Sequence, residues 1–221
     1  MNSKNYPPLY SWIVTIFVPL ALIMLGVRLL MTPMFLEMEY RMPGFPEDRF
    51  GFGLQDRLQW AKPSVGYLVN GDGIAFLAEL KLTDGKPIYN ERELSHMADV
   101  KGVVQSLLKI WYAGLAVLGL FGAWAWLGGW QGDYILGWKR GGYLTAGLLV
   151  VLGLFASISF WQFFTWFHSL FFSGDSWLFE YSDTLIRLFP IRFWEDAVAY
   201  IGGFSIVAGL LLGFGLKPKG K

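Results

Sequence analysis

Charged residues are absent from four long stretches of the chain, and hydrophobic residues in these stretches are too frequent to leave a polar face on a helix. The stretches are Asn5–Val27, Ile110–Gly132, Gly141–Gly174 and Ala197–Leu216. A helix needs about 20 residues to cross the hydrocarbon core of a bilayer, and a helix that is hydrophobic all round is a buried or membrane helix. The pattern therefore predicts four transmembrane helices. Their expected bounds are 1–36, 102–127, 141–172 and 197–216.

The polar segment between the first two spans, residues 37–101, is long enough to form a small domain. Its stretch "FPEDRFGFGLQDRLQW" has the polar and apolar spacing of an amphipathic helix, and Asp84–Gly85 is typical of a hairpin turn. Asn90, with Glu93 three residues later, predicts an N-cap box that begins a helix running into the second span. We therefore expect an all-α membrane protein with a small, mainly helical extracytoplasmic domain that contains a short β-hairpin.

Basic residues predict the orientation of the spans, because short basic loops stay cytoplasmic. Lys139 and Arg140 lie in the short second loop, and the third loop, residues 173–196, is rich in acidic residues. The remaining basic residues at the two ends of the chain are Lys4, Lys217, Lys219 and Lys221. Both termini are therefore expected to be cytoplasmic, with residues 37–101 and 173–196 outside. The first span is long and lacks a small-residue cleavage site, which favours a retained helix over a signal peptide.

Composition narrows the possible chemistry. The chain is 54% hydrophobic and 16% charged, which is unusual for a soluble domain, and it has no cysteine for a thiol nucleophile, disulfide or cysteine-based metal site. Its net charge of +1 and the lack of a basic patch argue against nucleic acid as a partner. No glycine-rich phosphate loop is present, and no cofactor is expected. The glycines of the membrane segments are interpreted as sites of close helix packing.

The two histidines of the chain, His96 and His168, are both expected at the extracytoplasmic end of the membrane segments. Asp99 lies at i+3 from His96, and Asp175 follows His168, so each imidazole has a carboxylate nearby in sequence. A carboxylate beside an imidazole fixes its tautomer and raises its basicity. The pair is interpreted either as a catalytic pair or as two interfacial side chains. These four residues together are also a possible zinc-ligand set, although their spacing is not that of a known motif.

Three further residues are candidates for binding substrate at the outer interface. Arg28 lies in the outer half of the first span, where it either snorkels to the surface or faces the bundle and binds a polar headgroup or carbonyl. Trp166 and Trp177 are either ordinary belt residues at the interface or walls of a lipid-sized cleft.

Two blocks of the sequence carry a resemblance to a known family. They are "YNERELSHMADVKGVV", residues 89–104, and "FHSLFFSGDSWLFEYSDTLIRLFP", residues 167–190. Both resemble hallmark stretches of the lipoprotein intramolecular transacylases, which are bacterial four-helix membrane proteins. The resemblance covers the layout of the whole chain, whereas residues 37–88 cannot be matched one by one.

The resemblance implies a defined reaction. Family members move the sn-2 acyl chain of a diacylglyceryl-modified lipoprotein to the α-amino group of its N-terminal cysteine, which gives the lyso form. The two family histidines match His96 and His168. Desolvation favours His168 as the base and Asp99 favours His96 as the acid, although the two roles could be reversed. No metal or ATP is required, and the partners are the lipoprotein and membrane lipids. Candidate oxyanion donors are Arg28, Ser169, Ser173 and backbone N–H groups.

Two other functions remain open from the residues alone. One is a non-enzymatic assembly factor or transporter subunit in which both histidines are structural, although helices two to four lack the interior charges of an ion pathway. The other is a metal-dependent membrane hydrolase that uses the same histidines.

Overall fold

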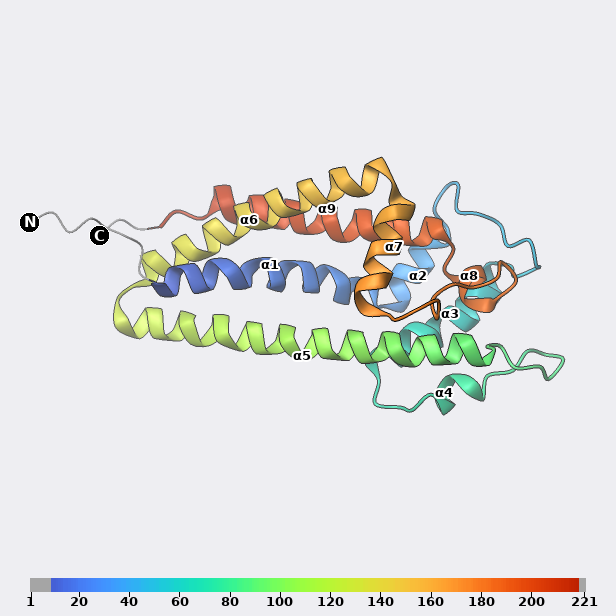
Figure 1. Ribbon diagram of the computed structural model, residues 1–221. Coiled ribbons are helices and arrows are strands. Elements are labelled where there is room, and N and C mark those ends of the chain that lie inside the picture. Colours follow the sequence, from blue (N-terminus) through green and yellow to red (C-terminus); the bar gives the residue numbers. More distant parts are fainter. Residues whose placement is uncertain (1–8, 219–221) are drawn as a thin grey trace, which may run out of the picture. The chain divides into compact units, whose positions relative to one another are not determined.

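The computed structural model describes residues 9–218, and within this range the chain is helical without a β-strand (Figure 1). The helices are α1 (Leu9–Leu30), α2 (Pro33–Glu39), α3 (Leu54–Val69), α4 (Ala75–Ala78), α5 (Glu91–Gly128), α6 (Gln131–Ile158), α7 (Phe160–Phe171), α8 (Thr184–Leu188) and α9 (Ile191–Gly215). Lys4, Lys219 and Lys221, which contributed to the predicted orientation, lie outside the described residues.

Four of these helices, α1, α5, α6 and α9, are long and apolar enough to cross a membrane. The prediction of four membrane helices is therefore confirmed, and the chain is a multi-pass membrane protein by length and composition. The chain divides into two compact units. The first contains the residues up to Val27, Leu108–Phe155 and the residues from Tyr200 onwards, and the second contains Arg28–Leu107 and Ala156–Ala199.

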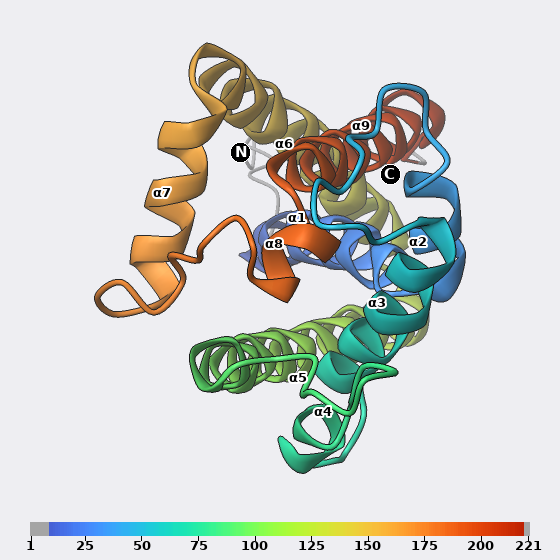
Figure 2. The same cartoon turned by 90° about the vertical axis from the view of Figure 1, so that its right-hand side faces the viewer.

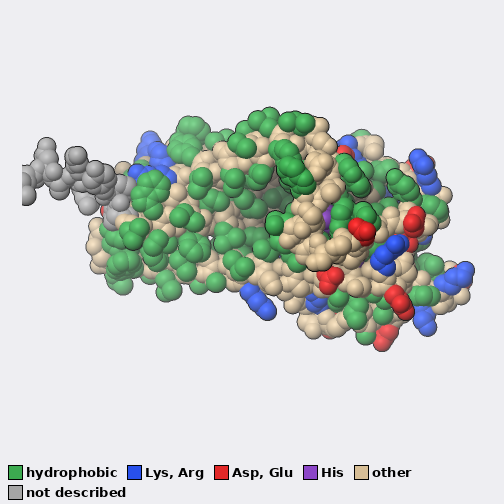
Figure 3. Space-filling model, viewed as in Figure 1, with side chains coloured by type: hydrophobic (Ala, Val, Ile, Leu, Met, Phe, Trp, Pro, Cys, Tyr) green, Lys and Arg blue, Asp and Glu red, His purple; other side chains and the backbone are tan. Residues whose placement is uncertain are grey.

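The first unit is a bundle of the four long helices (Figure 1). Polar side chains within it bond to backbone carbonyls of a neighbouring helix: the Trp111 indole donates to Ala21 O at 3.2 Å, and the Ser205 hydroxyl donates to Leu22 O at 3.3 Å. The outer surface is apolar, with Leu127 88% exposed and Val151 66% exposed, and Figure 3 shows hydrophobic side chains covering these helices. This is the surface that a bilayer core requires.

Glycines allow the helices of this bundle to approach closely. A Cβ atom added at Gly209 of α9 would lie 2.6 Å from the carbonyl oxygen of Gly142 in α6, and one added at Gly142 would meet Gly209 O even more closely. On the opposite side of α6, a Cβ atom at Gly137 would lie 2.7 Å from Ser11 O of α1. The interpretation of the membrane glycines as packing sites holds at these positions.

The predicted spans differ from the observed helices at their outer ends. The segment 141–172 was expected to be one helix, but Ser159 adopts an extended conformation (φ −154°, ψ 98°) and separates α6 from α7. Its hydroxyl accepts a hydrogen bond from Gln162 N, so the break is an N-cap that the apolar pattern concealed. In the same way, Thr32 ends the first predicted span by capping α2, with Pro33 at the first helical position.

Two other helices begin earlier in the sequence than predicted. Helix α6 begins at Gln131, directly after the turn at Gly129 (φ +72°), so Lys139 and Arg140 lie within a helix rather than in a loop. Helix α9 begins at Ile191, six positions before the expected start of the last span at Ala197.

The second unit contains α2, α3, α4, α7, α8 and the first half of α5. Helix α3 begins at Leu54, later than the expected start near Pro46, because the carboxylate of Asp56 accepts a hydrogen bond from Gly53 N and caps the helix there. The helix then continues through Pro63 to Val69.

The predicted β-hairpin is absent from the described residues and is reduced to a single antiparallel bridge between Lys81 and Pro87. The turn itself forms, with Gly85 at φ +83° and a hydrogen bond from Leu82 N to Lys86 O. Proline has no N–H group to donate, which limits extension of the ladder at Pro87.

A mainly apolar core holds the second unit together. Leu77 and Leu188 are fully buried, and Tyr67 and Met97 pack in the same cluster. This core joins α3, α4, α5 and α8, and thereby fixes the beginning of α5, where the first histidine lies.

Candidate active site

The structure brings the two histidines together. His96 lies in the second turn of α5 and His168 lies near the end of α7, and both belong to the second unit. Figure 2 shows the segment of this unit that leads from α7 to α8. The ring centroids are 6.3 Å apart and the ring planes differ by 20°. The two imidazoles therefore lie close enough together to belong to one site.

His168 is held in one tautomer by its own helix. Its Nδ1 lies 2.8 Å from the carbonyl oxygen of Phe164, one turn earlier, and since a carbonyl can only accept, Nδ1 carries the proton. The other nitrogen, Nε2, therefore presents a lone pair. The ring is 9% exposed and packs on Phe164 and Trp177, with centroids at 4.0 and 4.7 Å. Burial lowers the pKa of His168, and the hydrogen bond to Phe164 opposes that change.

His96 is as buried as His168 but is not anchored in the same way. It is 7% exposed, and its Nδ1 has no hydrogen-bond partner among the described residues. Aromatic rings surround it, with Phe172 at 5.0 Å and Phe179 at 5.3 Å between centroids. His96 precedes Lys101, so it lies before the charge-free part of α5. Burial, and after it the charge of His168, lowers the pKa of His96 to about 4, so both imidazoles are neutral at pH 7.

Glu93 ties the start of α5 to α8. Its carboxylate accepts hydrogen bonds from Asn90 N at 2.8 Å and from Leu185 N at 2.7 Å, and the side chain is 1% exposed. Asn90 returns the bond through its side-chain oxygen to Glu93 N, which confirms the predicted N-cap box. Burial raises the pKa of Glu93, and the backbone hydrogen bonds oppose that change.

A second link joins the start of α5 to Asp183, the residue that precedes α8. Arg92 forms an ion pair with Asp183 at 2.6 Å, just before α8, and Asn90 donates to the other oxygen of that carboxylate at 3.0 Å. The segment that ends at Asp183 begins after α7 and carries Phe172 and Phe179, the rings against His96. These links therefore hold the aromatic surroundings of the histidines in place.

The two predicted carboxylate partners do not join the site. Asp99 and Asp175 are exposed, and no hydrogen bond or ion pair between described residues connects either to a histidine. The expectation that Asp99 orients His96 is therefore wrong in this structure: spacing of i+3 put both residues on one helix, but phenylalanine rings occupy the space around the imidazole. No group of three or more His, Asp or Glu residues suited to a metal occurs in the described range, so the donor set of the zinc alternative is not assembled.

The remaining candidates are placed as follows. Arg28 donates to Met31 O at 3.3 Å and so closes the end of α1. Ser169 donates to Trp166 O at 2.9 Å on the exposed side of α7, and Ser173 is exposed. Trp166 is 57% exposed. Trp177 contacts His168, with ring centroids 4.7 Å apart.

Sequence reasoning missed the aromatic residues of the site. Phe164, Phe172 and Phe179 surround the two imidazoles, yet in the sequence they are three among 19 phenylalanines. The spacing of Phe164 one turn before His168 was the available signal. Glu93 was recognised as a helix cap, but its bond to α8 is a long-range contact that no local pattern contains.

Comparison with known proteins now identifies the family. A family described as "Lipoprotein intramolecular transacylase Lit" matches residues 12–194, a range that contains both histidines. The chain belongs to this family. Its name denotes an acyltransferase, so the transacylase resemblance found in the two sequence blocks is confirmed.

Individual proteins are similar to this chain over most of its length. A protein of Aquifex aeolicus (strain VF5), described as uncharacterized, is 32% identical over 213 residues, which is 93% of this chain and 92% of that protein. The solved structure of the membrane-integral lipoprotein intramolecular transacylase Lit from Bacillus cereus is 21% identical, with a TM-score of 0.77 over 92% of this chain and 91% of that one. A variant of the same protein in which one histidine is replaced by alanine gives a TM-score of 0.72, with 92% and 89% covered. These structures share the fold.

Proposed function

We propose that this chain transfers an acyl group within bacterial lipoproteins, from the sn-2 oxygen of the S-diacylglyceryl group to the α-amino group of the N-terminal cysteine. The observation that carries the proposal is the pair of neutral, buried imidazoles, 6.3 Å apart, in a chain of the transacylase family. The substrate supplies both nucleophile and ester, so much of the entropy of bringing them together is already lost.

His168 is proposed as the general base. An α-amino group has a pKa of about 7.7–8.0 and attacks an ester only after losing a proton. The bond from Nδ1–H to Phe164 O leaves Nε2 of His168 free to accept that proton, and it holds the ring in a fixed orientation. The amine nitrogen then forms a bond to the ester carbonyl carbon.

His96 is proposed as the group that protonates the leaving glycerol oxygen. When the tetrahedral intermediate collapses, the bond from carbon to glycerol oxygen breaks and that oxygen takes one proton from His96, while His96 receives the proton that His168 took from the amine. An imidazole with a pKa of about 4 gives up a proton readily once it has received one. The reaction therefore consumes no net proton, and an ester becomes a more stable amide without a cofactor.

The site is proposed to face the extracytoplasmic side, with both termini in the cytoplasm. Lys139 and Arg140, which lie near the start of α6, and Lys217, after α9, support this orientation. The acyl chains of the substrate would then remain in the bilayer while the glycerol and cysteine reach the histidines.

The test is mass spectrometry of a diacylglyceryl lipoprotein N-terminus after incubation with the full-length protein in lipid. We expect an acyl group on the α-amino nitrogen with unchanged total mass. The variants His96→Ala and His168→Ala are expected to give only starting material, and Glu91→Gln, an exposed neighbour on α5, to act like the wild type. Full transfer by either histidine variant would overturn the proposal.

The same experiment separates the two alternative functions. A product lighter by one acyl chain, together with inhibition by a chelator, would indicate a metal-dependent hydrolase. An unchanged lipoprotein after incubation with the wild-type protein would favour a non-enzymatic role.

A further inference from the structure

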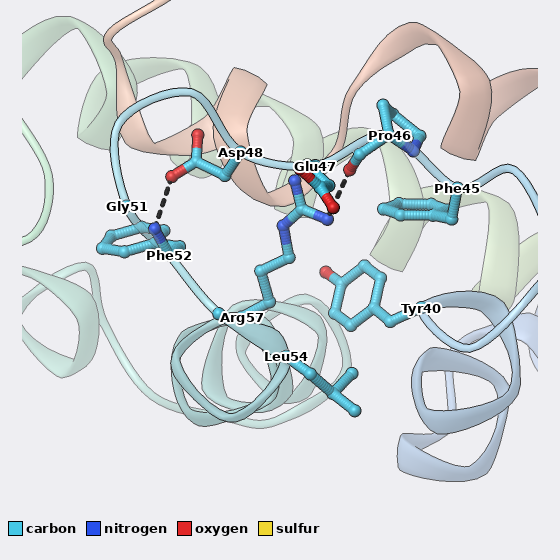
Figure 4. A pocket seen from close by; sticks show the side chains of 10 residues that line it. Tyr40, Phe45, Pro46, Glu47, Asp48, Gly51, Phe52, Leu54 and Arg57 are labelled. Carbon is cyan, nitrogen blue, oxygen red and sulfur yellow. Dashed lines mark hydrogen bonds between the residues drawn. The ribbon is translucent and has the colours of Figure 1, made fainter.

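A cavity of about 420 Å³ lies in the second unit, apart from the histidine pair. Its walls come from the end of α2, the loop that follows and the first turn of α3, as Figure 4 shows. None of its lining residues contacts His96 or His168 through a ring or hydrogen bond within the described chain. Its volume is in the range of small-molecule sites, about 300–1,000 Å³.

Arg57 is the charged group at the centre of this cavity. It rises from α3 toward the loop, its Nη1 donates to Pro46 O at 2.8 Å, and the residue is only 7% exposed (Figure 4). Its Nε–H group has no hydrogen-bond partner, and no carboxylate of the described chain lies within ion-pair distance. An unpaired buried charge is costly, so such a guanidinium is a candidate for binding an anion.

Asp48, an acidic residue of the loop, is already bound by another arginine. Asp48 accepts hydrogen bonds from Arg187 Nη2 at 2.9 Å and from Phe52 N at 2.6 Å. The guanidinium of Arg187 also lies over the Phe52 ring at 3.4 Å. Asp48 therefore forms its ion pair with Arg187 and links the loop to α8, and its charge acts on Arg57 only from beyond ion-pair distance. Glu47, the other acid at the cavity, is exposed to solvent.

Two further features of the cavity favour an anion with several oxygens. Leu54, in the first turn of the 16-residue helix α3, lines the cavity, and the first turn of a helix presents N–H groups with partial positive charge, although the N–H of Gly53 is already bonded to Asp56. The rings of Tyr40 and Phe45 lie 5.9 and 5.1 Å from the Arg57 guanidinium carbon and exclude water from one side of it.

We propose that this cavity binds a phosphate group, held by the free Nε–H edge of Arg57 and the N-terminus of α3. A tetrahedral oxyanion accepts both sets of donors, and guanidinium–phosphate bonds are strong because both partners are charged. The phosphate belongs either to a phospholipid headgroup or to free inorganic phosphate. The site requires no acyl transfer, so its test is independent of the proposed reaction.

The experiment measures thermal unfolding of the full-length protein in phospholipid-free detergent, because a ligand that binds only the folded state raises Tm. One arm titrates inorganic phosphate against chloride at constant ionic strength. The other adds a short-chain phosphatidylglycerol, compared with the diacylglycerol of the same chains. We expect Tm to rise with phosphate-bearing ligand in at least one arm, and the responding arm identifies the source.

Variants assign the response to the cavity. Arg57→Gln should weaken the apparent affinity about 10-fold or more, since it removes the charge-assisted bonds. Arg49→Gln, the same charge change on an exposed residue of the same loop, should respond like the wild type. If Arg57→Gln does not fold, Arg57→Lys replaces it and should show a weaker response. No rise in Tm of the wild type in either arm, or an unchanged response in the Arg57 variant, overturns the proposal.

Discussion

The two units of the protein bury polar groups in different ways. In the described part of the first unit the buried polar residues are hydroxyls, Ser11, Thr15, Thr145 and Ser205. The second unit buries acidic, basic and histidine side chains: these are Glu39, Arg57, Glu93, His96, Lys101 and His168. Ionised groups are expensive away from water unless they are paired.

This difference distinguishes the unit that is held together by helix packing from the unit that contains the candidate functional residues. The membrane bundle is stabilised by close backbone packing and needs little polar complementarity. In the second unit some buried charges are hydrogen-bonded, as Lys101 is by Asn70 Oδ1 at 2.8 Å and Asp72 O at 2.6 Å. Others, His96, Arg57 and Glu39, keep an atom without a hydrogen-bond partner among the described residues, and we assign function to the first two.

The largest expected effect comes from removing the imidazoles. His96→Ala and His168→Ala should each lower kcat/KM about 10²–10⁴-fold, the usual contribution of a general acid or base. Because the two residues act on one proton path, the double variant should lose little more than the worse single variant. Kinetics of lipoprotein conversion measure this, with Tm as the control for folding. A double loss equal to the product of the single losses would mean that the residues act independently.

A bulky residue at the closest helix contact should lower the stability of the first unit. Gly142→Leu places a side chain against Gly209, and overpacking of this kind typically costs about 1–3 kcal/mol. Gly147→Leu lies in the same helix with no atom within 4 Å of its added Cβ, so it is the matched control. Thermal unfolding in detergent should show a lower Tm only for Gly142→Leu. Equal Tm values for the two variants would contradict the importance of this close contact.

Glu93→Gln tests whether the link from α5 to α8 positions the site. The amide replaces one acceptor oxygen with a donor that faces a backbone N–H, and loss of a helix cap costs about 0.5–2 kcal/mol. We expect lower Tm together with lower kcat, whereas Glu91→Gln on the exposed side should change neither. Unchanged kcat in Glu93→Gln at a temperature where it is folded would remove Glu93 from a positioning role.

Glu39 predicts a pH dependence of stability. This side chain is 0% exposed and its carboxylate oxygens have no hydrogen-bond donor in the described chain. Burial, and after it the carboxylate of Asp196, raises the pKa of Glu39 to about 7, while Arg192 opposes the rise. The folded protein therefore keeps a proton that the unfolded chain releases near pH 4.5, and this stabilisation is lost as the pH rises toward 7.

Glu39→Gln should consequently raise Tm relative to the wild type at pH 8 and change it little at pH 4.5. The difference between the two proteins at each pH cancels the opposite contribution of His96, whose lowered pKa costs stability as the pH falls below 6.5. Glu79→Gln, on an exposed residue, serves as the control. A pH-independent difference would contradict the assignment.

The smallest expected effect is the lack of a histidine inflection in the activity profile. Because His96 titrates at about 4 and the pKa of His168 is also lowered, kcat/KM should show no break near pH 6.5. It should rise with pH up to about 8, where the substrate amine loses its proton. A break at pH 6–7 that disappears in His168→Ala would show that this imidazole is more solvated than its burial indicates.

Much of the fold was predictable because it depends on local composition. Runs without charge were long enough to span a bilayer, and the Asn90–Glu93 box marked where α5 begins, since both depend on residues adjacent in sequence. The breaks at Thr32 and Ser159 were missed, because a single hydroxyl cap does not interrupt an apolar pattern. The predicted β-hairpin is only a single bridge in the structure, because a favourable turn does not by itself produce a ladder of paired strands.

For the site, the sequence by itself determined which residues were rare enough to suspect, His96 and His168 above all. Only the tertiary structure decided what surrounds them: aromatic rings rather than Asp99, a tautomer set by Phe164, and a link to α8 through Glu93. It also decided that Asp48 pairs with Arg187 and that Arg57 has no ion-pair partner among the described residues. The physical reason is that hydrophobic burial follows from the composition of each segment, whereas pairing and desolvation of charges depend on which distant segments meet.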